Sequence, residues 1–594
     1  MTADALLPLL KSTFGFDAFR GRQADVVARV MARAHTLAVM PTGAGKSLTY
    51  QLPAVALDGC VIVVSPLIAL MHDQLRGARA AGIRAASLTS ADADHAETRQ
   101  AYRDGQLDLL YVAPERATGE GFRALLDARA PALFAIDEAH CVSEWGHDFR
   151  PDYRLLRPLL DAFPDVPRLA LTATADRHTR EDILVQLGIP ADGLVLAGFD
   201  RPNIRYRVSP RVSPAKQLAD FIAANPGPGI VYCPTRDGTE RMAERLAAAT
   251  GRPVAAYHAG LDPDRRARVQ HDFVASEDGI VTATVAFGMG IDKPDVRFVA
   301  HAGLPKSIES YYQETGRAGR DGDPAEALML WGADDFARAR MRLSELPEAR
   351  VASERARLNA LAALVETVEC RRALLLRHFG EHPPERCGNC DNCLDPPQQI
   401  DATVLAQKLL SAVYRTGQSY GAGHVEAVLT GRRDDRIAQR GHDSLSVFGI
   451  VEGEEVRLIK PLVRTLIARE ALATTEHGGL MFGPAARAMM KGEVAVLMAQ
   501  PPARRTQRGQ GMTRADRAAA NPVGDPLFDA LRAMRRELAA EAGVPPYVIF
   551  HDAALRAMTS ERPRTRAELA AIPGVGAKKL EAWGDAFLEV IGRY

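Results

Sequence analysis

The fold is decided by a short apolar run that leads into a glycine-rich loop, Thr36-Leu37-Ala38-Val39-Met40-Pro41-Thr42-Gly43-Ala44-Gly45-Lys46-Ser47. The run has the length of a buried strand, and a helical pattern follows it. Glycines let backbone N–H groups curl around phosphates, Lys46 would reach the β- and γ-phosphates, and the Ser47 hydroxyl would bind Mg²⁺. The general phosphate-loop pattern has Gly or Ala where Met40 stands, so this stretch alone leaves a nucleotide site and a chance Gly-Lys-Ser both open.

A second apolar run, Leu133–Ile136, ends in the acidic segment Asp137-Glu138-Ala139-His140. An Asp at a strand end can hold Mg²⁺, and the neighbouring Glu can polarise an attacking water. An isolated Asp-Glu pair is usually a solvated strand end. This pair lies about 90 residues after the phosphate loop, at the end of a buried strand, so the two features together favour nucleotide hydrolysis.

Short apolar runs alternate with amphipathic stretches as far as residue 335, and the pattern restarts after Asp200. The runs are residues 36–40, 60–65, 107–112, 133–136, 169–171, 229–232, 254–257, 279–282 and 296–300. This alternation is typical of parallel α/β sheets, whose ligands bind at the carboxyl ends of the strands. We therefore predict two successive α/β domains, at residues 1–203 and 204–335. After Phe336 the pattern predicts a helix over Arg338–Arg377, and a hairpin follows near Gly478–Phe482.

Length and composition bound the class of protein. The 594 residues correspond to three to five domains, and 47% hydrophobic with 25% charged residues is typical of a soluble globular chain. Lys+Arg and Asp+Glu both number 74, and this zero net charge by itself argues mildly against a nucleic-acid partner. The start lacks a signal-peptide pattern and no apolar stretch could span a membrane, so we expect no membrane partner and a reducing cytoplasm.

Four of the seven cysteines are crowded into one short segment: Cys370, Cys387, Cys390 and Cys393. Two CxxC spacings share Cys390, and four thiolates suit tetrahedral Zn²⁺. An Fe–S cluster or a redox dithiol is the competing interpretation. The remaining cysteines have no such spacing, and we expect them to be buried free thiols: Cys60, Cys141 and Cys233.

Over nearly its whole length the chain resembles the RecQ family of superfamily 2 DNA helicases, in which Met-Pro-Thr is the usual start of the phosphate loop. Phe14-Gly15-Phe16 with Phe19, Arg20 and Gln23 resembles the family's adenine-reading motif. Ser65–Met71 and Tyr111–Arg116 resemble its DNA-facing motifs, and Leu171–Ala175 resembles the segment that couples hydrolysis to domain movement. The resemblance implies nucleotide contacts from Arg20, Gln23, Thr42, Gly43, Ala44, Gly45, Lys46 and Ser47.

The segment after the acidic pair, Cys141–Pro151, resembles the family's aromatic-rich loop, which senses single-stranded DNA. Trp145 and Phe149 offer stacking faces for bases, and Arg150 can meet a phosphate. A lone aromatic is more often a core residue, but this Trp sits among acids, His and Gly directly after the hydrolytic pair. The resemblance implies DNA contacts from Trp145, His147, Phe149 and Arg150.

In the second α/β domain, Tyr311–Gly322 resembles the family's arginine-finger motif. We expect Arg317 and Arg320, three apart, to lie on one helical face and to reach the γ-phosphate from across a cleft. The resemblance implies that Arg320 is the finger and that Asp292, in the preceding motif Ala286–Lys293, faces the nucleotide. The catalytic set is then Lys46, Asp137, Glu138, His140, Gln313, Arg317 and Arg320.

The rest of the chain resembles the family's C-terminal modules. The resemblance implies a zinc-binding module at 336–397, a winged-helix domain at 401–500 and a small all-α HRDC-like domain at 525–594, with an Arg-rich linker at 501–524. Arg432, Arg433 and Arg436 are expected to contact duplex phosphates, although such a run is often only a solvated helix face. The hairpin near Gly478–Phe482 is short and lacks an obvious aromatic tip, so the sequence leaves its role in separating base pairs open.

The sequence therefore predicts a 3′→5′ DNA helicase that uses ATP, Mg²⁺ and Zn²⁺ on single-stranded and duplex or junction DNA. The resemblance implies a bacterial, nucleoid-associated monomer of the cytoplasm that acts in DNA repair, recombination, replication and the SOS response. Its partners would be single-strand-binding protein or other repair proteins. A DNA translocase or remodeller without strand separation is the alternative. An RNA helicase would lack the aromatic loop and zinc module, and a nucleotide-regulated scaffold would not need Lys46, Asp137, Glu138 and Arg320. Local arginine patches, averaged away in the net charge, would supply the DNA contacts.

Overall fold

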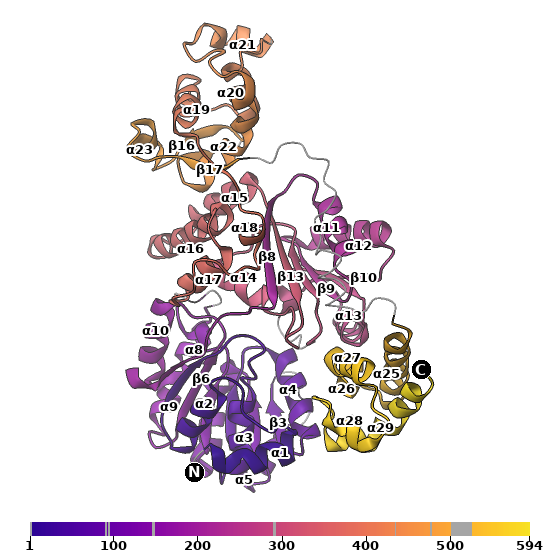
Figure 1. Ribbon diagram of the computed structural model, residues 1–594. Helices are drawn as coiled ribbons and strands as arrows, with labels where there is room; N and C mark the ends of the chain where they lie inside the picture. Colours follow the sequence, from indigo (N-terminus) through magenta and orange to yellow (C-terminus); the bar gives the residue numbers. More distant parts are fainter. Residues whose placement is uncertain are drawn as a thin grey trace.

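The computed structural model describes residues 3–89, 92, 95–144, 146, 149–288, 293–433, 435–475, 478–500 and 525–594. Figure 1 shows two sheets flanked by helices, one above the other, with a smaller domain at the top and a helical domain beside α13. The predicted Arg-rich linker, Trp145, His147 and Asp292 lie outside the described residues. No helix in these ranges is long and apolar enough to cross a membrane.

In the described part of the chain, the first sheet has seven parallel strands in the order β3-β4-β2-β5-β6-β1-β7. The strands are β1 (Thr36–Val39), β2 (Val61–Val64), β3 (Ala85–Leu88), β4 (Leu109–Val112), β5 (Leu133–Ile136), β6 (Arg168–Thr172) and β7 (Leu194–Leu196). The central strands are buried on both faces because helices cover both, which accounts for their continuous apolar sequences. The helices are α1 (Leu7–Phe14), α2 (Gln23–Met31), α3 (Leu48–Ala56), α4 (Ile68–Ala80), α5 (His95–Arg103), α6 (Pro114–Ala117), α7 (Glu120–Ala128), α8 (Pro151–Arg154), α9 (Leu156–Asp161) and α10 (Arg177–Leu187), and the 3₁₀ turn η2 (Ala139–Val142) follows β5.

Among the residues described after Asp200, the second sheet has six parallel strands in the order β10-β11-β9-β12-β13-β8. The strands are β8 (Ile204–Pro210), β9 (Gly229–Tyr232), β10 (Val254–Tyr257), β11 (Ile280–Ala283), β12 (Phe298–His301) and β13 (Ala325–Trp331). The helices between them are α11 (Pro214–Ala224), α12 (Arg236–Thr250), α13 (Pro263–Ala275) and α14 (Ile308–Thr315). The edge strand β8 is the surface on which the next module packs.

Helices α15 (Ala333–Leu343), α16 (Glu348–Glu366) and α17 (Arg371–His378) follow the second sheet, and the short α18 (Asp391–Leu394) follows the cysteines. The single helix predicted over Arg338–Arg377 is therefore wrong. Pro347 starts a new helix because proline suits a helix N-terminus, and the Asn392 amide stabilises the turn before α17 by donating to the carbonyls of Thr367 and Glu369. Asp391 receives the backbone N–H of Val208 at 2.9 Å, which fastens this module to β8.

Two small helical domains complete the chain. The first contains α19 (Thr403–Arg415), α20 (Ala422–Leu429), α21 (Asp435–Gln439), α22 (Val456–Ala468) and α23 (Ala486–Met490), with the antiparallel pairs β14 (Gln399–Asp401) with β17 (Leu497–Ala499) and β15 (Leu472–Thr474) with β16 (Leu480–Phe482). The predicted hairpin is thus present as β15–β16. The last domain, yellow in Figure 1, has α25 (Pro526–Ala542), α26 (Pro546–Ile549), α27 (Asp552–Glu561), α28 (Arg566–Ala571) and α29 (Ala577–Gly592).

Candidate functional site

The phosphate loop joins β1 to α3, at the carboxyl edge of the first sheet. Gly43 and Gly45 have φ angles of 85° and 72°, which are strained for any residue with a side chain, so the loop's path depends on both glycines. The Lys46 ammonium donates to the carbonyl of Met40 at 3.3 Å, and Ser47 is the N-cap of α3. The loop therefore has the curled backbone and the helix N-terminus that suit a phosphate.

Gln23, at the start of α2, contacts this loop directly. Its amide nitrogen donates to the carbonyls of Ala44 and Gly45 at 3.0 and 3.1 Å, and its amide oxygen accepts the N–H of Arg20 at 2.8 Å. The Arg20 guanidinium lies 5.5 Å from the centre of the Phe16 ring. The predicted adenine-reading residues thus lie beside the predicted phosphate-binding residues.

The acidic pair follows β5, which lies two places from β1 in the sheet with β6 between them. Burial, together with the neighbouring Glu138 charge, raises the pKa of Asp137 to about 7, although the Lys46 ammonium acts against this shift. A carboxylate that is hard to ionise beside one lysine fits a site that takes a further cation, and Asp137 with Ser47 supplies the oxygen ligands Mg²⁺ prefers. Glu138 has a left-handed backbone with φ of 48°, which turns the chain sharply into η2.

His140 connects this pair to the end of β6. Its Nδ1 lies 3.0 Å from the Thr172 hydroxyl and 3.3 Å from a Glu138 carboxylate oxygen. Because β6 carries the segment predicted to couple hydrolysis to domain movement, the imidazole bridges two predicted motifs.

The second sheet brings its arginine segment to the opposite side of the phosphate loop. A Cβ added to Gly43 would lie 3.2 Å from Cγ of Arg320, and one added to Gly288 would meet the Arg317 guanidinium. Helix α14 ends at Thr315, so the two arginines lie in the turns after it and the predicted common helical face is wrong. Gly316 and Gly319 follow α14, and turns rather than a helix deliver Arg320 to the cleft. Gln313 is on the last turn of α14.

Arg201, which the sequence analysis missed, bridges the two α/β domains. Its guanidinium donates to Thr42 in the phosphate loop at 3.0 Å and to Gly316, Ala318 and Gly319 in the arginine segment at 3.0, 2.8 and 2.9 Å. All four acceptors are backbone carbonyls, for which no side-chain motif exists. In the sequence, the feature that could have pointed to this residue is its position between the two α/β domains, five residues after the last strand of the first sheet.

The described residues of the aromatic-rich loop contact η2 and a DNA-facing motif. Arg150 donates to the carbonyl of Pro66 at 3.0 Å, and the Arg154 guanidinium lies 5.2 Å from the centre of the Phe149 ring. Gly146 is buried, and its N–H donates to Ser143 at 3.0 Å. The Arg150 N–H also donates to the Cys141 carbonyl at 2.9 Å, so the structure places Arg150 against η2, the turn that follows the hydrolytic pair.

The four predicted zinc ligands come together at the start of α17 and around α18. Their sulfur atoms all lie within 4.8 Å of one another, with Cys370–Cys390 at 3.9 Å and Cys387–Cys393 at 4.0 Å. Tetrahedral Zn²⁺ with bonds of about 2.3 Å separates its sulfur ligands by about 3.8 Å, so the cluster fits this ion. Cys60, Cys141 and Cys233 are buried and form no disulfide, as expected.

The predicted duplex-contacting arginines lie at the far end of the winged-helix domain. Arg432 and Arg433 follow α20, Arg436 is on α21, and all three are exposed. Figure 1 shows α20 and α21 at the top of the molecule, away from both sheets. They form a surface separate from the nucleotide cleft.

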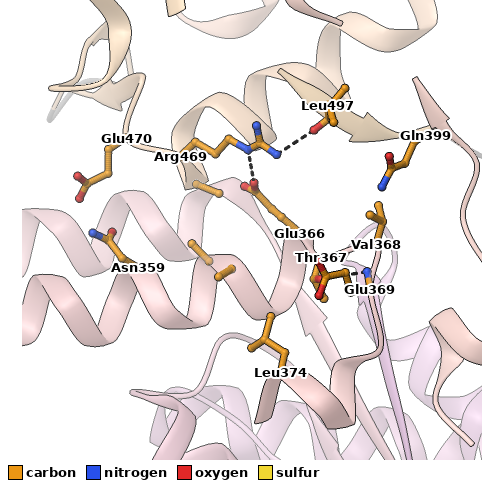
Figure 2. Close-up of a pocket in the computed structure, with 13 residues that line it drawn as sticks. Asn359, Glu366, Thr367, Val368, Glu369, Leu374, Gln399, Arg469, Glu470 and Leu497 are labelled. Carbon is orange, nitrogen blue, oxygen red and sulfur yellow. Dashed lines mark hydrogen bonds and ion pairs between the residues drawn. The ribbon is translucent and has the colours of Figure 1, made fainter. Parts of the chain in front are cut away.

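A cavity of about 620 Å³ lies where the winged-helix domain joins α16. Figure 2 shows Glu366 pointing toward Arg469, whose guanidinium donates to the Glu366 carboxylate at 3.1 Å and to the carbonyl of Leu497 at 2.9 Å. Burial raises the pKa of Glu366 to about 8, although Arg469 and Arg340 act against this shift. Arg340 donates to the carbonyls of Ile467 and Ala468 at the end of α22, so the junction is polar.

The last domain contacts the second sheet domain through charged groups. Arg532 and Arg535 of α25 pair with Glu277 at 2.8 and 2.5 Å, and Arg556 pairs with Asp323 at 2.8 Å. Asp323 lies three residues after Arg320, so this domain touches the arginine segment from outside the cleft.

Comparisons with known proteins match each of these modules. The family model of the DEAD/DEAH box helicase matches residues 20–183, the helicase conserved C-terminal domain 214–322, the RecQ zinc-binding model 333–394, the RQC domain 396–507 and the HRDC domain 525–591. The "ATP-dependent DNA helicase RecQ" of Haemophilus influenzae is 42% identical over 98% of this chain and 95% of its own length. The chain belongs to the RecQ family. The proteins of the same name from Pasteurella multocida and Bacillus subtilis are 40% and 37% identical, over 99% of this chain and 94% and 98% of their own lengths.

The family resemblance and the predicted fold class are thus confirmed: two parallel-sheet α/β domains precede zinc-binding, RQC and HRDC domains. The cysteine cluster of this RecQ family member lies in the part that the zinc-binding model matches, which supports Zn²⁺ over an Fe–S cluster or a redox dithiol. The individual residue roles remain predictions.

Proposed function

We propose that the protein is an ATP-dependent DNA helicase that hydrolyses ATP to move 3′→5′ along one DNA strand and to separate duplex DNA. The observation that carries the proposal is the approach of Arg320 in the second α/β domain to Gly43 in the phosphate loop of the first. A cleft lined by Lys46, Asp137 and Glu138 on one side and Arg320 on the other has the groups that phosphoryl transfer needs. The three relatives above are named ATP-dependent DNA helicases, which supports the proposal.

Within the cleft we assign one role to each side chain. Lys46 neutralises the β- and γ-phosphates, Glu138 orients and polarises the attacking water, and Arg320 stabilises charge that develops on the γ-phosphate. Gln23 reads the adenine edge, with Arg20 beside it. Mg²⁺, held by Ser47 and Asp137, would neutralise phosphate charge in this site.

The remaining residues of the set link hydrolysis to DNA. His140 connects Glu138 to Thr172, and η2 leads directly into the aromatic-rich loop. We assign base stacking to Trp145 and Phe149, phosphate contact to Arg150 and a further DNA contact to His147. Asp292 is assigned to the nucleotide, and Gln313 and Arg317 to the catalytic set. Opening and closing of the cleft would then move the two α/β domains alternately along the strand.

Outside the motor, the cysteine cluster supports a structural zinc module, and the exposed Arg432, Arg433 and Arg436 contact duplex phosphates. We further propose that the protein acts as a monomer in the bacterial cytoplasm, at the nucleoid, in repair and recombination. Single-strand-binding protein or other repair proteins are the proposed partners.

ATP hydrolysis measured without nucleic acid, with single-stranded DNA and with RNA tests this function, together with strand displacement on 3′-tailed and 5′-tailed duplexes. We expect stimulation by DNA and displacement of the 3′-tailed substrate. Lys46→Ala and Arg320→Ala should each lower turnover by about 10³-fold, whereas Arg177→Ala, in an exposed pair on α10, serves as the matched control. DNA stimulation without displacement would make the protein a translocase, and hydrolysis indifferent to DNA would contradict both activities.

A further inference from the structure

The long helix of the zinc module touches the DNA-sensing loop of the first α/β domain. Arg357, near the middle of α16, donates from Nη2 to the carbonyl of Gly146 at 3.1 Å, across 211 positions of sequence. Its side chain is only 13% exposed, and Glu354, one turn earlier on the same helix, pairs with the guanidinium. The arginine is therefore held in one orientation by its own helix while it contacts another domain.

Gly146 is a position where the loop has little freedom. A Cβ added there would lie 2.2 Å from the carbonyl oxygen of His140, so the Gly146 peptide is pressed against η2. His140 in turn contacts Glu138 and Thr172. The peptide that Arg357 holds is thus connected to Glu138 of the hydrolytic pair through one residue, His140.

The carboxyl end of α16 is held by two separate sets of contacts. At its carboxyl end, Glu366 pairs with Arg469 of the winged-helix domain (Figure 2), and the turn that follows is bound by Asn392 of the zinc module. A helix of 19 residues is about 28 Å long and bends little over that length. The position of Arg357 is therefore fixed by the helix and does not depend on the conformation of the loop.

We propose that Arg357 is a positioning residue for DNA-stimulated ATP hydrolysis: it anchors Gly146, and with it the DNA-sensing loop, to the zinc module. The inference rests on the proposed function. DNA binds a loop that is already ordered at one peptide, so less conformational entropy is lost on binding. Without the anchor, DNA must order the loop itself, and more DNA is needed for the same stimulation.

The test compares Arg357→Ala with Arg350→Ala, an exposed arginine on the same helix, in the full-length protein. ATP hydrolysis is measured without DNA and across a titration of oligothymidylate. A charge-assisted hydrogen bond supports a change of about tenfold. In Arg357→Ala we expect a tenfold rise in the half-saturating DNA concentration, a lower maximal rate, and unchanged DNA-free rate and KM for ATP. Arg350→Ala should match the wild type.

A double-mutant cycle with Trp145→Ala separates positioning from a general structural effect. If Arg357 acts through the loop, then Arg357→Ala adds no further loss of DNA stimulation to Trp145→Ala. Additive losses, a wild-type DNA titration in Arg357→Ala, or a raised DNA-free rate would each overturn the inference. If Arg357→Ala does not fold, Glu354→Gln replaces it, with an expected shift of about threefold in the same direction. A wild-type protein that DNA does not stimulate would instead contradict the proposed function.

Discussion

Removing the Arg201 guanidinium should disconnect the two sides of the nucleotide cleft while leaving each side folded. In Arg201→Ala, the hydrogen bonds to Thr42 in the phosphate loop and to three carbonyls of the arginine segment are lost together. We therefore expect the closed arrangement, in which Arg320 lies over Gly43, to become rarer.

The size of the effect follows from the number of bonds and their exposure. Hydrogen bonds from a charged donor contribute about 1.5–3 kcal/mol when buried. Arg201 is half-buried and water can replace it at the four carbonyls, so we take about 0.5–1 kcal/mol for each bond. The sum of about 2–4 kcal/mol corresponds to roughly 30- to 700-fold fewer closed molecules.

Steady-state ATP hydrolysis at saturating single-stranded DNA measures the consequence. We expect kcat/KM for ATP to fall by about 30-fold or more, while binding of a fluorescent ATP analogue to the first domain changes by less than about threefold. The control is Arg205→Ala, four residues later, which removes a pair with Glu326 away from the cleft. A kcat/KM within threefold of the wild type, or loss of nucleotide binding as complete as in Lys46→Ala, would refute the bridging role.

Three further changes test other parts of the structure. Burial raises the pKa of Glu366 from 4.5 to about 8. Between pH 4.5 and 8 the folded chain therefore keeps a proton that the unfolded chain loses, so the stability of the wild type falls as pH rises. The melting temperature of Glu366→Gln should rise relative to that of the wild type between pH 5 and 8, with no further relative rise above pH 8. Cys390→Ser should abolish bound zinc, measured by atomic absorption, and expose the module to trypsin, whereas Cys60→Ala should retain the metal. Glu277→Arg places like charge against Arg532 and Arg535, so the last domain should separate from the second sheet domain. Small-angle scattering should then show a larger radius of gyration, and high salt should have the same effect on the wild type. Asp237→Arg, in an exposed pair on α12, is the control and should leave the radius of gyration unchanged.

The strands that could be predicted from sequence were those with uninterrupted apolar runs, such as β5 and β9. The structure adds β3, β7, β8 and β13. Charged residues disguise two of these: β8 carries Arg205 and Arg207, and both pair with Glu326 on the neighbouring β13. From sequence alone, a charged residue whose partner lies on the adjacent strand resembles a solvent-exposed loop residue, because the partner is distant along the chain.

The cleft shows the same division. Lys46 and Asp137 follow recognisable strands, so their meeting at one sheet edge could be anticipated from the parallel topology. The contacts of Arg201 and Arg357 could not be anticipated, because their partners are backbone carbonyls of distant segments. Every residue has a backbone carbonyl, so no residue type marks such a partner. The expected helical face for Arg317 and Arg320 was wrong because α14 ends at Thr315, and Gly319, with a φ of 56°, adopts a left-handed conformation that does not continue a helix.

The two hydrogen bonds from Gln23 to the phosphate loop bear on how one base is chosen over another. The amide that we propose reads adenine is already satisfied by the carbonyls of Ala44 and Gly45, and Gln23 is only 3% exposed. A base gains affinity here only by the difference between the contacts it makes and those it displaces. A base that offers both a donor and an acceptor to the amide recovers the loss, whereas one with the opposite pattern leaves a buried polar group unpaired, at about 1–3 kcal/mol. Selectivity among nucleotides would thus depend on how well a base replaces the loop carbonyls of Ala44 and Gly45 as hydrogen-bond partners of the Gln23 amide.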